Sequence, residues 1–230
     1  MRSPIVSQLS LIERFNMETT RRIEEVQSLV EQLAVFSNMS LKYAESFLQL
    51  SRAEHLDHRD FGLVDMHSVV DSAYAQVAVL GVERKIRIVI ERTDDECLLL
   101  GDSNLLERAI MNLLANAIQY SDEAGEILLS ITIQKQICVS IADTGQGIDE
   151  AALPHLFEPY FREVKEQIGI GEAENQPVKR KAKLRNRSNY GLGLSFVNTV
   201  VKKHGGHIEV ESKKNEGTTF RLLFTAAEID

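Results

Sequence analysis

Residues 137–148 read Ile-Cys-Val-Ser-Ile-Ala-Asp-Thr-Gly-Gln-Gly-Ile, an alternating apolar run that ends in a carboxylate and two glycines. The alternation predicts a half-buried strand with Asp143 at its end. Gly145 and Gly147 allow the backbone to turn sharply and to approach a flat ligand closely. A partly buried carboxylate beside such a turn can accept a hydrogen bond from an exocyclic amine such as that of adenine. A plain Asp-Gly turn is the alternative interpretation.

Strand and helix patterns surround this stretch on both sides. Alternating apolar residues predict further strands at 86–90, 127–133, 208–210 and 220–224. Helical spacing falls between them at His67–Leu80, Asn104–Gln119 and Gly191–His204. Strands interspersed with helices predict an α+β fold over residues 58–230, with a two-layer α/β sandwich whose mixed sheet has one buried face.

The helix predicted at 104–119 carries two amides on one face. Asn112 and Asn116 are four residues apart, and Arg108 lies one turn earlier. The opposite face would turn apolar residues into the core, namely Leu106, Ile110, Leu113 and Ala117. A carboxamide oxygen is a suitable ligand for Mg²⁺, which keeps waters and phosphates as its other ligands. Simple solvation of both amides is the alternative.

Two glycines also open the last predicted helix, in the run Tyr190-Gly191-Leu192-Gly193-Leu194. A helix start exposes unpaired N–H groups and the positive end of the helix dipole, which together favour phosphate. The spacing is neither that of the phosphate loop nor that of the dinucleotide fingerprint. Close packing of the helix start would explain the glycines equally well.

The segment before Gly62 contains no glycine or proline after Pro4, and its apolar residues recur at helical spacing. The polar stretch Asn16–Arg22 predicts the turn of a helical hairpin within residues 1–57. A hairpin cannot bury both of its apolar stripes alone, so we expect a second copy and a four-helix bundle. Packing of the helices on their own globular domain is the alternative.

Composition excludes several classes of protein. The net charge of −8 argues against a nucleic-acid-binding protein, although Lys179–Arg187 is strongly basic. No signal peptide or membrane-spanning run is present, and the cysteines lack metal-ligand spacing. The polar segment at about 162–190 far exceeds the usual connection of about 4–6 residues, which predicts a lid.

Taken together, these motifs resemble the GHKL ATPases, and within them the sensor histidine kinases. Asn112–Ser121 is similar to the asparagine box, and Asp143–Gly147 to the first glycine box. Leu156–Arg162 resembles the phenylalanine box, and Gly191–Leu194 the second glycine box. The resemblance covers about Phe61 to Phe224, with all motifs in the family's order.

The resemblance implies ATP and Mg²⁺ as cofactors, with Asn116 on the metal and Asp143 on the adenine amine. Asn112 stands where ATP-hydrolysing relatives carry a glutamate base, and Arg162 would stabilise the transferred phosphoryl group. The other residues that the resemblance assigns to ATP binding are Tyr120, Gly145, Gly147, Gly191, Leu192, Gly193, Leu194 and Thr219.

The first residues resemble the end of the dimerisation-helix motif of these kinases. Met1-Arg2-Ser3-Pro4-Ile5 matches its last part, so the phospho-accepting histidine would precede Met1 by two residues. Ser3 would then occupy a position associated with dephosphorylation of the partner. Two departures from the family pattern stand out, since Gln119 replaces a common lysine and Asn189 a common glycine.

The sequence therefore predicts a protein-histidine kinase core that transfers the ATP γ-phosphoryl group to a histidine for relay to a response-regulator aspartate. The expected partners are a receiver domain and a second copy of the chain, in the cytoplasm, with no nucleic acid. A membrane would be involved only through a sensor region ahead of Met1. An ATP-binding pseudokinase scaffold and another GHKL ATPase stay open as alternatives.

Overall fold

The computed structural model describes residues 4–57, 59, 61–161 and 191–227. The predicted lid at 162–190 lies outside the described residues, as do Ser3 and Arg162. The elements follow one another in the order α1 (Pro4–Glu54), β1 (Gly62–Asp65), α2 (Met66–Glu83), β2 (Arg87–Arg92), β3 (Leu98–Gly101), α3 (Ser103–Tyr120), β4 (Glu126–Ile133), β5 (Ile137–Asp143), the 3₁₀ helix η2 (Glu150–His155), α5 (Gly193–Lys203), β6 (His207–Lys213) and β7 (Gly217–Phe224).

A five-stranded mixed sheet forms one layer of the globular unit, in the order β2-β4-β5-β7-β6. β2 runs parallel to β4, and the remaining neighbours are antiparallel. The register places Asp143 of β5 opposite Thr218 of β7, at the end of the strand where the glycine-rich loop begins. β1 and β3 form a separate antiparallel pair. The predicted α+β class is confirmed.

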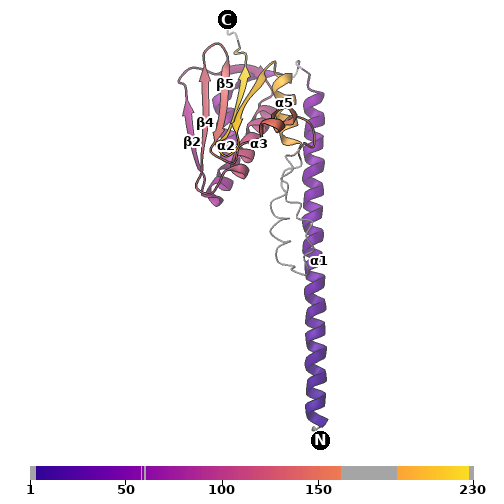
Figure 1. The fold of residues 1–230 in the computed structure, drawn as a ribbon. Helices are drawn as coiled ribbons and strands as arrows, with labels where there is room; N and C mark the ends of the chain where they lie inside the picture. Colours follow the sequence, from indigo (N-terminus) through magenta and orange to yellow (C-terminus); the bar gives the residue numbers. More distant parts are fainter. Residues whose placement is uncertain (1–3, 58, 60, 162–190, 228–230) are drawn as a thin grey trace. The chain divides into compact units, whose positions relative to one another are not determined.

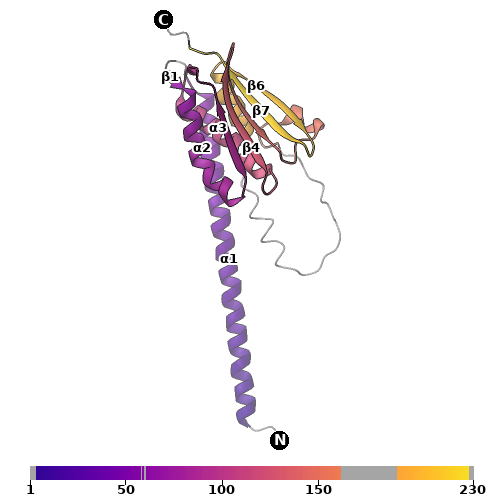
Figure 2. The same cartoon turned by 90° about the vertical axis from the view of Figure 1, so that its left-hand side faces the viewer.

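Three helices form the second layer. Figures 1 and 2 show α2, α3 and α5 on one face of the sheet. Their apolar sides meet the buried side chains of the central strands, as at Ile110 of α3, Ile131 of β4 and Val200 of α5, all fully buried. The burial of Leu106, Ile110, Leu113 and Ala117 confirms the face of α3 that the sequence predicts to be apolar.

The predicted turn at Asn16–Arg22 does not form, because one uninterrupted helix runs from Pro4 to Glu54. Polar residues such as those of 16–22 lower helix propensity by only fractions of a kcal/mol each, and the segment has no glycine or proline. A turn at this place would need stabilisation by the packing of two helices against each other. The described part of this single chain has no such packing here. The prediction of helix is confirmed, and that of a turn is wrong in this structure.

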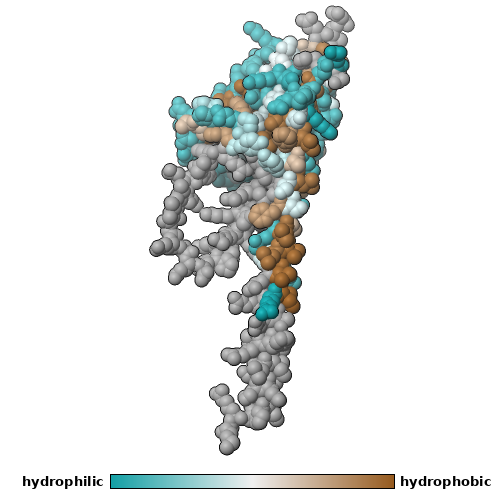
Figure 3. Space-filling view, turned by 90° about the vertical axis from the view of Figure 1, so that its right-hand side faces the viewer, coloured by the Kyte–Doolittle hydropathy of each residue, from teal (hydrophilic) through white to brown (hydrophobic). Residues whose placement is uncertain are grey.

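The chain divides into two compact units, Met1–Glu45 and Ser46–Asp230, so the division falls within α1 and before the predicted boundary at 57/58. Large apolar side chains stay exposed along the described part of α1, as Figure 3 shows in brown. Leu33 is the most exposed of them, at 67%. In the part of the chain that the structure describes, no helix combines the length and the apolar character needed to cross a membrane.

Candidate nucleotide-binding site

α3 presents Asn112 beside the start of α5. Asp102 caps the start of this helix, and its Oδ1 accepts a hydrogen bond from the N–H of Leu105 (3.0 Å). Further along, the Nδ2 of Asn112 donates to the carbonyl oxygen of Arg108 (3.0 Å), which fixes the orientation of the amide. Its Oδ1 is then turned towards Gly193, where an added Cβ would lie 3.3 Å away. The asparagine helix and the second glycine segment are therefore neighbours, as the resemblance implies.

The start of α5 has the features of an anion site. Leu192 precedes the helix with its side chain buried, and no side chain caps this end among the described residues. The first backbone N–H groups of a helix have no partner within it and carry the positive end of its dipole. Gly193 does not have a positive φ, and a Cβ added there would meet only the end of the Asn112 side chain, so the fold itself does not require glycine there. Space for a ligand would explain it.

Asp143 holds a half-buried carboxylate at the end of β5. The backbone N–H of Gly145 donates to its Oδ1 (2.9 Å), and the N–H of Thr218 hydrogen-bonds to the same carboxylate. Burial raises the pKa of Asp143, and these two hydrogen bonds offset part of that rise. A desolvated carboxylate held by two donors still has lone pairs to accept a further hydrogen bond from a ligand.

The two glycines after Asp143 lie where backbone meets backbone. A Cβ on Gly145 would stand 2.4 Å from the carbonyl oxygen of Tyr120, at the end of α3. A Cβ on Gly147, which has a φ of +61°, would stand 2.0 Å from the carbonyl oxygen of Lys213. Between them, the N–H of Gln146 donates to the same Tyr120 oxygen (3.2 Å). The loop is thus pressed between α3 and the turn that joins β6 to β7.

The phenylalanine box lies against the second glycine segment. Phe157 packs on the core, and Tyr160 takes a φ of +67°. The N–H of Tyr160 donates to the carbonyl oxygen of Gly191 (2.8 Å), which itself has a φ of +73°. This bond joins the two described ends of the chain on either side of residues 162–190.

His204 is a site-supporting residue that the sequence analysis does not assign. It is buried, and its Nε2 accepts a hydrogen bond from the N–H of Asp102 (2.9 Å), the residue that caps α3. Its Nδ1 lies 2.7 Å from the carbonyl oxygen of Val200 in α5, and Phe61 stacks on its ring with centroids 4.8 Å apart. His204 therefore aligns the two helices that carry Asn112 and Gly193. The run His-Gly-Gly after a helix is the sequence signal for it.

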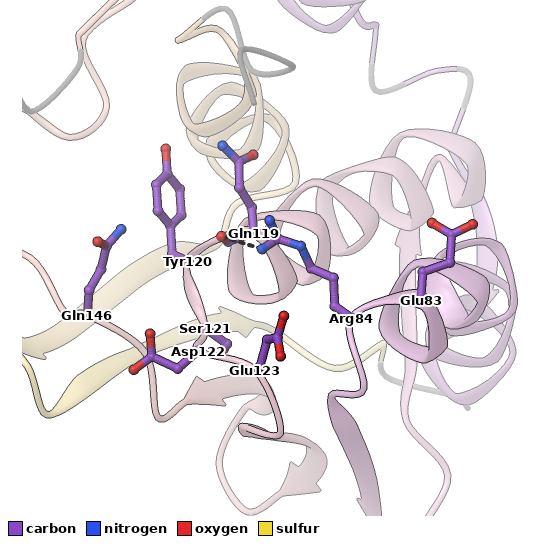
Figure 4. A pocket seen from close by; sticks show the side chains of 8 residues that line it. All are labelled: Glu83, Arg84, Gln119, Tyr120, Ser121, Asp122, Glu123 and Gln146. Carbon is purple, nitrogen blue, oxygen red and sulfur yellow. Dashed lines mark hydrogen bonds between the residues drawn. The ribbon is translucent and has the colours of Figure 1, made fainter. Parts of the chain in front are cut away.

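A polar cavity of about 320 Å³ adjoins the site at the ends of α2 and α3. Figure 4 shows Arg84 reaching the carbonyl oxygen of Gln119, an interaction of 2.7 Å that neutralises the C-terminal end of α3. Of the predicted nucleotide-binding residues within the described part of the chain, Tyr120 alone lines this cavity. The cavity is therefore a neighbour of the predicted site and not its centre.

Two further predicted residues are located by the helix or the strand that carries them. Asn116 follows Asn112 by one helical turn on α3, and Thr219 pairs with Ala142 in the sheet. Thr218, which the sequence analysis does not assign, is the residue that donates its N–H to Asp143. The described residues contain no group of three histidine, cysteine or carboxylate side chains that could hold a metal.

Comparisons with known proteins agree with this arrangement. The family model of histidine kinase-, DNA gyrase B- and HSP90-like ATPases matches residues 101–228. The adaptive-response sensory kinase SasA of Crocosphaera subtropica is 33% identical over 143 residues, which are 61% of this chain and 32% of that protein. The chain thus spans about a third of the length of this curated relative.

Solved structures give the same result for the fold. The mycobacterial sensor histidine kinase MprB is 26% identical, with a TM-score of 0.56 over 74% of this chain and 99% of that one. The histidine kinase ThkA, in complex with the response regulator TrrA, has a TM-score of 0.55 over 73% of this chain and 42% of that one, and at 19% identity shows the fold alone. The chain belongs to the family of histidine kinase-, DNA gyrase B- and HSP90-like ATPases, whose shared domain binds ATP.

Proposed function

We propose that this chain is the catalytic core of a sensor histidine kinase, which binds Mg-ATP and transfers its γ-phosphoryl group to a histidine. The observation that carries the proposal is the carboxylate of Asp143, desolvated and held by two backbone N–H groups beside a glycine loop. The Asn112 side chain lies close to Gly193, where an added Cβ would stand 3.3 Å from its Oδ1, and this supports a phosphate site at the start of α5. The sensor kinases among the relatives favour histidine as the acceptor.

In the proposed complex, Asp143 accepts a hydrogen bond from the exocyclic amine of adenine. Gly145 and Gly147 keep the loop thin enough for the ring to approach the backbone. Tyr120, exposed at the end of α3, would cover one side of the base. A half-buried carboxylate in this position discriminates for an amine, because a ring without that donor would leave one of its lone pairs without a partner.

The donor set fits Mg²⁺ held jointly with phosphates. Asn116 would supply a neutral oxygen, and the phosphates would supply the negative charge. The metal would neutralise charge on the phosphates. Gly191–Leu194 would offer backbone N–H groups to them, and Arg162 would stabilise the transferred group.

Asn112 bears on which acceptor is used. Its amide cannot take a proton from water, so a water nucleophile would not be activated at this position. The imidazole of histidine needs no such base to attack phosphorus in line. The hydrogen on Nδ2 of Asn112 that is not used on Arg108 would donate to a phosphate oxygen while the histidine attacks.

We further propose relay to a response regulator and assembly as a homodimer in the cytoplasm, with Ser3 acting on the regulator's phosphoryl group. ThkA, which shares the fold, is bound to such a regulator. The dimer would cover the exposed apolar side chains of α1, among them Ile23, Val26, Val30, Leu33 and Phe47. A membrane would be involved only through a sensor region ahead of Met1.

Sedimentation velocity tests the dimer. We expect the chain to sediment as a dimer and Leu33→Glu as a monomer, because the new charge would be buried between the helices. The control Gln32→Glu places the same charge on an exposed polar position of α1 and should stay dimeric. A dimer that persists in Leu33→Glu would contradict assembly through this stripe.

Titration with a fluorescent ATP analogue tests the nucleotide site. Asp143→Ala should weaken binding by about 10-fold or more, because the adenine amine loses its acceptor. Ser140→Ala, on the same strand, is the matched control and should leave binding unchanged. Equal affinity in the wild-type chain and Asp143→Ala would remove the adenine assignment.

Radioactive labelling tests the transfer itself. A version of the chain that carries His-Asp ahead of Met1 should become labelled from γ-labelled ATP, with a phosphoryl bond that acid hydrolyses and alkali does not. Failure of this version to become labelled while it binds ATP would favour a pseudokinase scaffold.

A further inference from the structure

Ser212 connects three segments next to the glycine-rich loop. It lies on the edge strand β6, opposite Thr218 of β7. The N–H of Ile148 donates to its Oγ (2.9 Å), its Oγ donates to the carbonyl oxygen of Gly217 (3.0 Å), and its Oγ lies 2.8 Å from that of Thr218. One side chain thus joins the loop, the turn and the neighbouring strand.

The direction of these hydrogen bonds follows from counting donors. A serine hydroxyl has one hydrogen to donate and two lone pairs to accept with. Its hydrogen is used on the oxygen of Gly217, so the hydroxyl of Thr218 must donate to Ser212. Ser212 accepts from Ile148 with its other lone pair. All three positions of the hydroxyl are occupied, which leaves none for a ligand.

This network reaches the carboxylate that we assign to adenine through Thr218, and it also holds backbone next to Asp143. The N–H of Thr218, a buried residue, hydrogen-bonds to the carboxylate of Asp143. Gly217 has a φ of +113°, and a Cβ there would stand 2.0 Å from the carbonyl oxygen of Asp143. Ile148 lies near the end of the loop that follows Asp143. Movement of either anchor would therefore move the carboxylate.

The other contacts between the loop and the turn constrain the carboxylate of Asp143 less. The N–H of Asn215, at an exposed position of the turn, donates to the carbonyl oxygen of Gln146 in the loop (2.7 Å). The ion pair between Lys214 and Asp149 (2.9 Å) is exposed, and such pairs contribute little. Ser212 supplies the one side-chain tether, among those described between loop and turn, that is partly buried and reaches both Ile148 and Thr218.

We propose that Ser212 is a positioning residue for adenine recognition: its hydroxyl holds the loop and Thr218 so that the carboxylate of Asp143 faces the exocyclic amine. Ser212 does not touch the nucleotide. It acts by limiting the orientations of Asp143, in the way that supporting hydrogen bonds hold binding groups in a productive geometry. This inference rests on the proposed function, because it presupposes that adenine binds at Asp143.

The test compares ATP with ITP, in which an oxygen replaces the exocyclic amine. Affinities of the full chain for both nucleotides are measured by titration for the wild type, Ser212→Ala and Ser212→Thr. The wild type should prefer ATP, and Ser212→Ala should lose about 3- to 10-fold in ATP affinity with less than about 2-fold change for ITP. Ser212→Thr retains the hydroxyl on a β-branched strand residue and should restore the preference.

Equal losses for ATP and ITP in Ser212→Ala would overturn the inference, since they would mean a general loss of structure. No change for either nucleotide would overturn it as well. A wild type that binds ATP and ITP equally would overturn the adenine assignment and with it this inference, whereas transfer of the phosphoryl group could still be measured separately.

Hydrogen exchange gives a second readout that does not depend on nucleotide. The amide of Ile148 should exchange faster in Ser212→Ala and at the wild-type rate in Ser212→Thr, because its acceptor is removed in one and kept in the other. Ser130→Ala, in the same sheet, is the control and should not alter exchange at Ile148. Unchanged protection of Ile148 in Ser212→Ala would contradict the tether.

Discussion

The loop from Asp143 to Asp149 and the start of α5 both place glycines around the proposed nucleotide, yet the protein holds them differently. At Gly147 an added Cβ would stand 2.0 Å from a backbone carbonyl, and at Gly193 it would stand 3.3 Å from the end of the Asn112 side chain. Gly147 also has a left-handed φ, whereas Gly193 does not. The first glycine is required by the fold, whereas at the second we propose that the bound nucleotide needs the space.

Gly147→Ala should have the largest effect of these variants. It tests whether the fold requires glycine in the loop. Its Cβ meets backbone atoms that cannot move aside, so the free energy of unfolding should fall by about 2–4 kcal/mol, measured by urea denaturation. Gly205→Ala is the matched control, because Gly205 has a φ of +68° with open space around it. The control should lose about 1–2 kcal/mol. Equal losses would show that the backbone contact is unimportant.

Asp143→Asn separates binding from stability within the loop. ATP affinity should fall by about 10-fold, because the amide presents a donor where the adenine amine needs an acceptor. The free energy of unfolding of the variant, by contrast, should rise relative to that of the wild type. Burial raises the pKa of Asp143 in the folded state, so the folded chain holds this proton to higher pH than the unfolded chain does.

The stabilising contribution of that proton is present at low pH and is lost as the pH rises through the raised pKa. The variant has no such group. The free energy of unfolding of Asp143→Asn, relative to the wild type, should therefore increase from about pH 4 towards pH 7. Urea denaturation across that range measures it, and a difference that stays constant with pH would argue against a desolvated carboxylate.

Gly193→Ala tests whether the glycine at the start of α5 leaves space for a ligand. Its stability should change by less than about 0.5 kcal/mol, since the new methyl group needs only a small shift of Asn112. ATP affinity should still fall by about 3- to 10-fold, because the methyl group would occupy space that the phosphates need. Gly81→Ala, another glycine in a helix, should leave affinity unchanged. A destabilised Gly193→Ala with normal ATP binding would reverse our interpretation.

Lys214→Ala should have the smallest effect. The ion pair between Lys214 and Asp149 is exposed and salt-screened, so neither thermal stability nor ATP affinity should change measurably. A clear loss of ATP affinity would mean that the loop depends on this surface pair and not only on Ser212 and backbone bonds.

Local patterns predicted the elements of the globular unit well. The helix expected at Asn104–Gln119 is Ser103–Tyr120, and that at Gly191–His204 is Gly193–Lys203. Amphipathic helices and alternating strands carry their own signal, because burial imposes the period. The short strands β1 and β3 and the 3₁₀ helix η2 were missed, since about four to six residues give too few repeats to show a period.

The parts of the site that escaped prediction depend on distant segments meeting. Thr218 donates to Asp143 because of the register between β7 and β5, which no local pattern specifies. The roles of Ser212 and His204 likewise need tertiary neighbours far along the chain. The prediction of a turn at Asn16–Arg22 was wrong because it relied on a local pattern alone, and local polarity does not by itself end a helix.

The two outer strands of the five-stranded sheet bear on how the protein behaves in concentrated solution. Exposed strand edges can pair with other chains and start aggregation. β6 exposes the ionisable side chains of His207, Glu209, Glu211 and Lys213, and β2 those of Arg87, Glu91 and Arg92. Adding another molecule to either edge would bring these charges out of water. Association through these two described strand edges is thereby disfavoured, in keeping with our proposal that copies of the chain meet through the exposed apolar side chains of α1.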